Sequence, residues 1–147
     1  MTNMTNMTIT QLAAAVLVVL MATGCSSVTD PSKNVSQPFS GSVQPNNLGP
    51  VHSFTISNSG ELTVVINTIV PGSTFLGVEY GQVSGASCAP LQNPTAVSSA
   101  NLGKTVITAQ LTNKGTYCVQ ALDPSLTGLN LPALVVGQNY TLTVSHP

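Results

Sequence analysis

The sequence has no arginine and no tryptophan, and only 5% of its 147 residues are charged. Three lysines stand against four acidic residues, so the formal net charge is −1. Binding to nucleic acid needs clustered Lys or Arg, and this sparse set excludes such a surface. Thr, Ser, Asn and Gln supply most of the polar groups instead, and they can hydrogen-bond to water without carrying charge.

Titratable groups for catalysis are also scarce. General acid–base chemistry needs such groups held in pairs, but the acidic residues are far apart in the sequence: Asp30, Glu61, Glu79 and Asp123. We expect His52 to be a partly buried strand residue and His146, next to the last residue, to be solvated. No Gly-x-Ser-x-Gly nucleophile motif is present. The sequence therefore predicts a protein that is not an enzyme and has no catalytic residues, metal site or cofactor.

One long apolar run is present, at residues 12–21 (LAAAVLVVLM). Ten residues are too few to cross about 30 Å of hydrocarbon, but they match the apolar region of a signal peptide. The residues that follow, Met-Ala-Thr-Gly-Cys at 21–25, resemble the lipobox of bacterial lipoproteins. The resemblance implies that residues 1–24 form a helical signal peptide and that Cys25 is lipidated and becomes the first residue.

That resemblance also implies a location in the cell envelope, with a lipid anchor to the membrane. Ser26 after the lipidated cysteine implies the outer membrane where two membranes exist. Ala22 replaces the usual Leu, and the leader has no Lys or Arg, so a secreted or periplasmic protein with a plain signal peptide stays open. Residues 25–36 are polar and aperiodic, which predicts a flexible tether.

Assigning Cys25 to lipid leaves an even pair, Cys88 and Cys118. In an oxidising compartment such a pair predicts a disulfide. The alternatives are a thiol nucleophile, or a metal site completed by His52 or His146, although the cysteine spacing is unlike that of metal sites.

Residues 37–147 read as one all-β domain. Short runs alternate apolar and polar residues between Gly, Pro, Asn and Ser, which is typical of strands. The predicted strands are 39–43, 51–56, 61–69, 75–80, 104–111, 116–122 and 139–145. Residues 95–100 are ambiguous, 81–94 form a loop and 113–115 a hairpin turn. Seven or eight such strands predict an antiparallel β-sandwich with Greek-key or jelly-roll connections. The alternation in strand 116–122 predicts that Cys118 faces away from the core.

Four segments resemble the bacterial pre-peptidase C-terminal domain: SFTI at 53–56, GELTV at 60–64, GTYCV at 115–119 and YTLTV at 140–144. The resemblance implies a β-sandwich that is generally non-catalytic and serves secretion, stabilisation or polymer binding. Some relatives bind calcium through grouped acidic residues, which this sequence lacks.

Residues 123–138 (DPSLTGLNLPALVVGQ) are strongly apolar and long for a connection between strands. They could fold back as a cap on the sandwich, form an extra edge strand, or expose an apolar patch to a protein partner, a lipid or a second copy. The candidate patch residues are Leu126, Leu129, Leu131, Leu134 and Val135.

These observations favour a membrane-anchored, non-catalytic β-sandwich that acts as a structural or interaction module in the cell envelope. Two alternatives stay open: a polysaccharide-binding lipoprotein, and an accessory domain that acts in trans with a secreted hydrolase.

Overall fold

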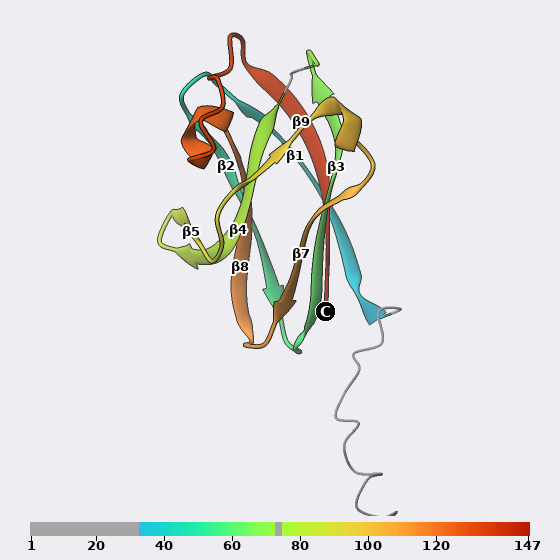
Figure 1. The fold of residues 1–147 in the computed structure, drawn as a ribbon. Coiled ribbons are helices and arrows are strands. Elements are labelled where there is room, and N and C mark those ends of the chain that lie inside the picture. Colours follow the sequence, from blue (N-terminus) through green and yellow to red (C-terminus); the bar gives the residue numbers. More distant parts are fainter. Residues whose placement is uncertain (1–32, 73–74) are drawn as a thin grey trace, which may run out of the picture.

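The alternating segments form strands that pack as two antiparallel sheets in the computed structural model, which describes residues 33–72 and 75–147 (Figure 1). The predicted signal peptide, Cys25 and most of the predicted tether lie outside the described residues. The strands are β1 (Val35–Val43), β2 (Leu48–Ile56), β3 (Gly60–Val70), β4 (Leu76–Ser84), β5 (Ser87–Pro90), β6 (Thr95–Val97), β7 (Thr105–Leu111), β8 (Gly115–Leu122) and β9 (Gln138–His146).

One sheet has four strands in the order β1-β9-β3-β7. The other has five: the order is β2-β8-β4-β5, and β6 also pairs with β4. The predicted all-β antiparallel sandwich is therefore confirmed, with nine strands in the described residues where seven or eight were expected.

The core lies between the sheets and uses the faces that the alternation predicted. Leu62, Val64 and Ile66 of β3 face Leu76 and Val78 of β4 in one cluster of buried side chains. The same cluster includes six buried residues of the other two central strands: Tyr117, Val119 and Ala121 of β8, and Tyr140, Leu142 and Val144 of β9.

Two local predictions were wrong, and one segment that the sequence left ambiguous is now assigned. The segment 81–94 is not a loop, because β4 continues to Ser84 and pairs with β5 as a hairpin. The turn at 113–115 is not a hairpin turn, because β7 and β8 lie in different sheets. The chain crosses there from one sheet to the other, and a turn motif alone does not distinguish the two arrangements. The ambiguous segment 95–100 holds β6 and the start of a short 3-10 helix, η2 (Ser99–Asn101).

Strands β1 and β2 are the edge strands on one side of the sandwich, each at the end of its own sheet. Each contains a proline, Pro38 in β1 and Pro50 in β2. The pairing of β2 with β8 is also irregular between Leu48 and Val51.

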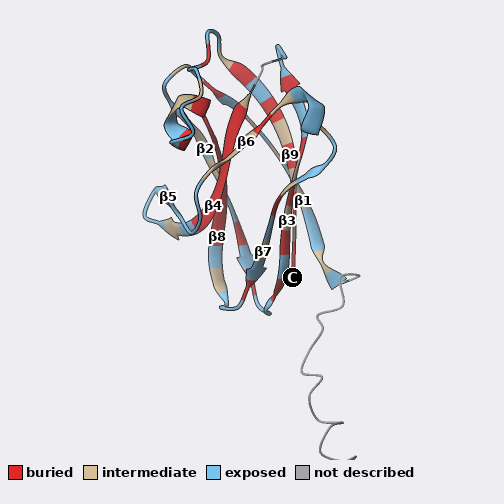
Figure 2. Ribbon diagram, in the orientation of Figure 1, coloured by how far each residue is buried: buried red, intermediate tan, exposed pale blue. Residues whose placement is uncertain are grey.

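The two sheets differ in how their outer faces are covered (Figure 2). Strands β3 and β9 alternate buried and more exposed residues along most of their length. Six consecutive residues are buried in β4, from Leu76 to Gly81, and six in β8, from Tyr117 to Leu122. The five-stranded sheet is therefore covered on both faces along these two strands.

Candidate functional site

The segment between β8 and β9, residues 123–137, is called the cap here; it lies at one end of the sandwich, and its first turn packs on the outer face of β4 (Figure 1). It starts at Asp123, turns through the 3-10 helix η3 (Pro124–Thr127), and reverses at Gly128 with a φ of 76°. Such a positive φ is natural for glycine, which has no Cβ to clash.

The Asp123 carboxylate holds the cap in place. It is fully buried. Oδ1 accepts hydrogen bonds from the N–H and hydroxyl of Ser125, at 2.8 and 2.6 Å. Oδ2 accepts from the N–H groups of Asn46, at 2.8 Å, and Leu134, at 2.9 Å. One carboxylate thus links the turn between β1 and β2 to the start of the cap, at Ser125, and to its later part, at Leu134.

The protonation of Asp123 follows from these contacts. Burial alone favours the neutral acid, but hydrogen bonds from Ser125, Asn46 and Leu134 all favour the carboxylate. The hydrogen bonds outweigh burial and hold the pKa of Asp123 below its ordinary value. The group is therefore charged at neutral pH, and its charge is satisfied by four donors.

The predicted patch residues divide between core and surface. Leu134 is only 7% exposed and packs in the core cluster, so it cannot belong to an exposed patch. Its N–H is the one bound to Asp123, which pulls the backbone inward at that point. Leu131 is half-buried, whereas Leu126, Leu129 and Val135 are exposed, Val135 to 93%. The segment is thus both a cap and an apolar surface.

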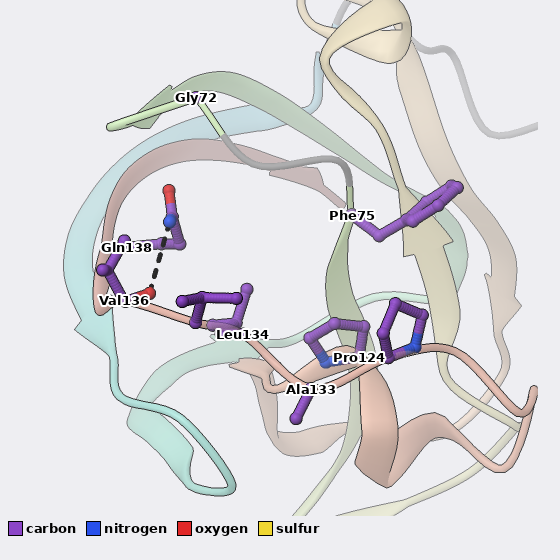
Figure 3. Close-up of a pocket in the computed structure, with 9 residues that line it drawn as sticks. Gly72, Phe75, Pro124, Ala133, Leu134, Val136 and Gln138 are labelled. Atoms are coloured by element: carbon purple, nitrogen blue, oxygen red, sulfur yellow. Dashed lines mark hydrogen bonds between the residues drawn. The ribbon is translucent and has the colours of Figure 1, made fainter.

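A cleft of about 250 Å³ lies beside the cap (Figure 3). Apart from Gln138, none of its lining residues has a polar side chain: they are Gly72, Phe75, Pro124, Pro132, Ala133, Leu134, Val135 and Val136. Gln138 is 3% exposed, and its Nε2 donates to the backbone oxygen of Val136 at 3.3 Å. Its Oε1 is buried and has no hydrogen-bond partner.

Sequence reasoning missed Gln138, although a signal was available. It has the same strand parity as Tyr140, Leu142 and Val144, so the alternation that predicts their inward direction applies to Gln138 too. A polar residue at such a position needs a hydrogen-bond partner.

The predicted disulfide between Cys88 and Cys118 is confirmed, with Cα atoms 5.8 Å apart. Cys88 is on β5 and Cys118 on β8, and β4 pairs with both strands. Two strand spacings would separate them by about 9.5 Å in a flat sheet, so β5 must curl over β4. Gly81 permits this, because a Cβ there would lie 2.0 Å from the Ala89 oxygen.

The disulfide also decides between the alternatives for these cysteines. Cys118 alternates with Tyr117 and Val119 of the core, so it lies on the outer face of its sheet as predicted. Both sulfurs are consumed in the bridge, which removes the thiol nucleophile and the Cys–His metal site. Among residues 33–72 and 75–147, no three His, Cys, Asp or Glu side chains are grouped to hold a metal.

His52 has a structural place between the two sheets, as its expected partial burial suggested. Its Nε2 lies 2.8 Å from the Tyr140 hydroxyl, and its ring stacks on Phe39 at 4.9 Å. Burial lowers the pKa of His52 and raises the pKa of Tyr140, so both side chains are neutral at neutral pH. The cluster closes the side of the sandwich between β1 and β2.

The prediction that His146 is solvated was wrong. The ring is 3% exposed and stacks on Phe54 at a centroid distance of 4.8 Å. Strand β9 runs to this residue and pairs it with Val35, so its position near the chain end does not expose it. Its buried Nε2 has no hydrogen-bond partner.

Comparisons with known proteins add little to these observations. No protein-family profile matches the chain, and no curated protein sequence matches it. One solved structure that the chain matches is PliG of Aeromonas hydrophila, a periplasmic inhibitor of g-type lysozyme. It is 16% identical, the match covers 80% of this chain and 91% of that one, and the TM-score is 0.48. In the described part of the chain, no helix is long and apolar enough to span a membrane.

Proposed function

We propose that this chain is a non-catalytic lipoprotein of the cell envelope, anchored through Cys25, whose sandwich presents one apolar end to a protein partner. The observation that carries the proposal is the position of the exposed apolar side chains. They gather at the end of the sandwich opposite the start of β1.

The strand pairings define these two ends. Val35 at the start of β1 pairs with His146, whereas Val43 at its end pairs with Gln138, next to the cap. Nine strand residues span about 30 Å. A chain attached to a membrane through residues before Val35 would therefore display the cap on the side away from its attachment.

The far end, defined as residues 44–48, 70–72 and the cap, has the surface chemistry of a protein interface. It holds six of the eight large apolar side chains that are exposed in the described residues: Leu48, Val70, Leu126, Leu129, Val135 and Val136. Its only charged residue, Asp123, is buried. Apolar residues with few charges characterise the centre of protein–protein interfaces, and grouped exposed apolar side chains mark interaction sites.

Two experiments test the proposal. Cys25→Ser should release the protein from the membrane fraction into the soluble fraction, and unchanged membrane association would refute the anchor. For the partner, a photo-crosslinking residue at Val135 should give a discrete adduct in envelope preparations, while the same residue at exposed Thr108 of the four-stranded sheet gives none. Adducts at both positions, or at neither, would refute the specific role of the far end.

A second candidate, binding of a polysaccharide, is favoured by one feature. A shallow groove of about 400 Å³ on the four-stranded sheet is lined mostly by polar residues, among them Ser40, Ser42, Thr68, Asn139 and Thr141. Hydroxyls and amides of this kind can hydrogen-bond to sugars. Against it, all three tyrosines are buried and the chain has no tryptophan, so it lacks an exposed Tyr or Trp ring on which a sugar could stack. Selective binding on a glycan array would favour this candidate over the first.

A further inference from the structure

The cleft beside the cap has one feature that the fold does not explain. Gln138 Oε1 is a buried hydrogen-bond acceptor without a partner. The amide orientation is fixed, because Nε2 donates to the Val136 oxygen and a flip would set two oxygens against each other. In Figure 3 the amide oxygen points away from Val136, on the side of the residue where Gly72 lies. The fold therefore leaves, in a residue that lines the cleft, a buried acceptor that a bound donor could satisfy.

We propose that this cleft binds the indole ring of a tryptophan from a partner protein, with the indole N–H donated to Gln138 Oε1. The inference rests on the proposed function and names the side chain that the far end recognises. An apolar ring suits the cleft, because no lining side chain other than Gln138 is polar. The occupant also needs a donor for the one free acceptor.

The remaining contacts favour a group that donates and does not accept. Pro124 and Pro132 have no N–H, the N–H of Leu134 is bound to Asp123, and Nε2 of Gln138 is bound to Val136. No other lining side chain carries a donor, so a ligand acceptor would find none among these side chains. Indole is the apolar side chain whose polar atom is donor only, whereas a phenol oxygen also accepts.

The size of the cleft supports a single side chain. Its volume of about 250 Å³ is below the 300–1,000 Å³ typical of sites for larger organic ligands. Tryptophan and other aromatic residues are also enriched among the residues that dominate interface energetics.

The chain cannot supply this occupant to itself or to a second copy. Its sequence has no tryptophan. Its three tyrosines, Tyr80, Tyr117 and Tyr140, are at most 8% exposed and belong to the core cluster. A tryptophan or an exposed tyrosine must therefore come from a different protein.

The test uses the full-length, ¹⁵N-labelled protein in detergent micelles and two probes, N-acetyl-tryptophanamide and its analogue methylated on the indole nitrogen. The first probe should shift the side-chain amide signals of Gln138 in a saturable way. The methylated probe lacks the donor and should bind about fivefold more weakly, the loss expected for one hydrogen bond. No saturable shift up to the solubility limit, or equal affinity for the two probes, overturns the inference.

Variants sharpen the test. Gln138→Met keeps the length of the side chain and removes the acceptor, so affinity for N-acetyl-tryptophanamide should fall about fivefold. Leu129→Ala is the matched control, because Leu129 is exposed in the cap but does not line the cleft, and it should bind like the parent. If Gln138→Met does not fold, Ala133→Leu narrows the cleft from its lining and should weaken binding as well. Parental affinity in either cleft variant overturns the inference.

The two proposals can fail separately. Crosslinking at Val135 together with no indole binding would eliminate the tryptophan site and leave the apolar end as an interface. Absence of crosslinking together with selective indole binding at Gln138 would leave the cleft and refute the proposed interface around it.

Discussion

The outer faces of the two sheets carry similar residues but meet different surroundings. On the four-stranded sheet, outward polar side chains pair in the open: Asn67 with Thr143 at 2.9 Å, and Thr68 with Thr141 at 2.8 Å. On the five-stranded sheet, outward Gln120 is 5% exposed and its Nε2 donates to the Gly49 oxygen at 2.7 Å. The strands themselves do not determine this difference, because it comes from chain segments that fold over one sheet only.

The covered face depends on a few specific contacts, namely the Asp123 carboxylate, the disulfide and the close approach at Gly81. The open face has many exposed contacts of small energy each. We therefore expect substitutions on the two faces to differ sharply in their effect on stability. Four sets of substitutions and one pH dependence test that contrast.

The largest effect should come from Asp123→Asn. Both carboxylate oxygens accept hydrogen bonds, so an amide must turn its NH₂ group toward donors on one side. Two donors then lose their acceptor, and the free energy of unfolding should fall by about 4 kcal/mol. Glu61→Gln makes the same chemical change at an exposed position and should alter the free energy of unfolding by less than about 0.5 kcal/mol. Denaturant unfolding measures both, and equal effects would contradict the contrast.

The same carboxylate predicts a pH dependence. The pKa of Asp123 is lower in the folded protein than its ordinary value, which in unfolded chains is about 3.9. The stability that the Asp123 carboxylate contributes is therefore complete above the pKa of the unfolded chain. It is lost as the pH falls through the lower pKa of the folded protein. Melting temperatures between pH 2 and 6 should fall more steeply with acid in the parent than in Asp123→Asn. Parallel curves would show that the group does not stabilise the fold through its charge.

The second largest effect should come from removing the disulfide. It closes a loop with a sequence separation of 30 residues, so Cys88→Ala with Cys118→Ala should cost about 3 kcal/mol. Reduction of the parent protein should lower the free energy of unfolding by a similar amount. A double variant as stable as the oxidised parent would show that the covered face does not need the bridge.

Gly81→Ala should have an intermediate effect. The new Cβ would meet the backbone of Ala89, so β5 has to move off β4, at a cost of about 2 kcal/mol. Gly72→Ala is the matched control, because no atom lies within 4 Å of a Cβ built there. The difference between the two melting temperatures measures how tightly β5 is closed over the sheet.

The smallest effect belongs to the open face. Replacing Thr68 and Thr141 together by Val removes their hydroxyl hydrogen bond but keeps two β-branched side chains on an exposed surface. The free energy of unfolding should change by less than about 0.5 kcal/mol. A loss as large as that of Gly81→Ala would mean that the open face is as specifically built as the covered one.

The alternation predicted the sandwich and its inward residues because burial between the sheets acts on each strand in the same way. It did not predict the burial of Glu79 or Gln120, since polar residues at outward positions usually mark a solvated face. Their cover comes from elsewhere in the chain, as where Thr127 of η3 approaches Gly77. The glycines at 77 and 81, both on the outer face of β4, were the available sign of close approach.

For the candidate site, composition predicted an apolar segment at 123–138, but not which residues turn inward. That choice depends on the hydrogen bond from Leu134 to Asp123 across 11 residues, which no local pattern encodes. The burial of Glu79 has a consequence of its own: loss of water raises the pKa of its carboxyl. In the sequence, only the glycines at 77 and 81 on the same face of β4 distinguish Glu79 from the exposed Glu61.

The prolines of the two edge strands acquire a further meaning if the chain is tethered in a membrane plane. Tethered neighbours meet at high local concentration, and a chain with 5% charged residues has little repulsion to keep them apart. An exposed strand edge is a template on which another chain can add and polymerise. Pro38 and Pro50 each remove a backbone donor from such an edge, and the irregular register of β2 disturbs it further. Resistance to aggregation in this protein would then reside in its backbone, where most proteins rely on surface charge.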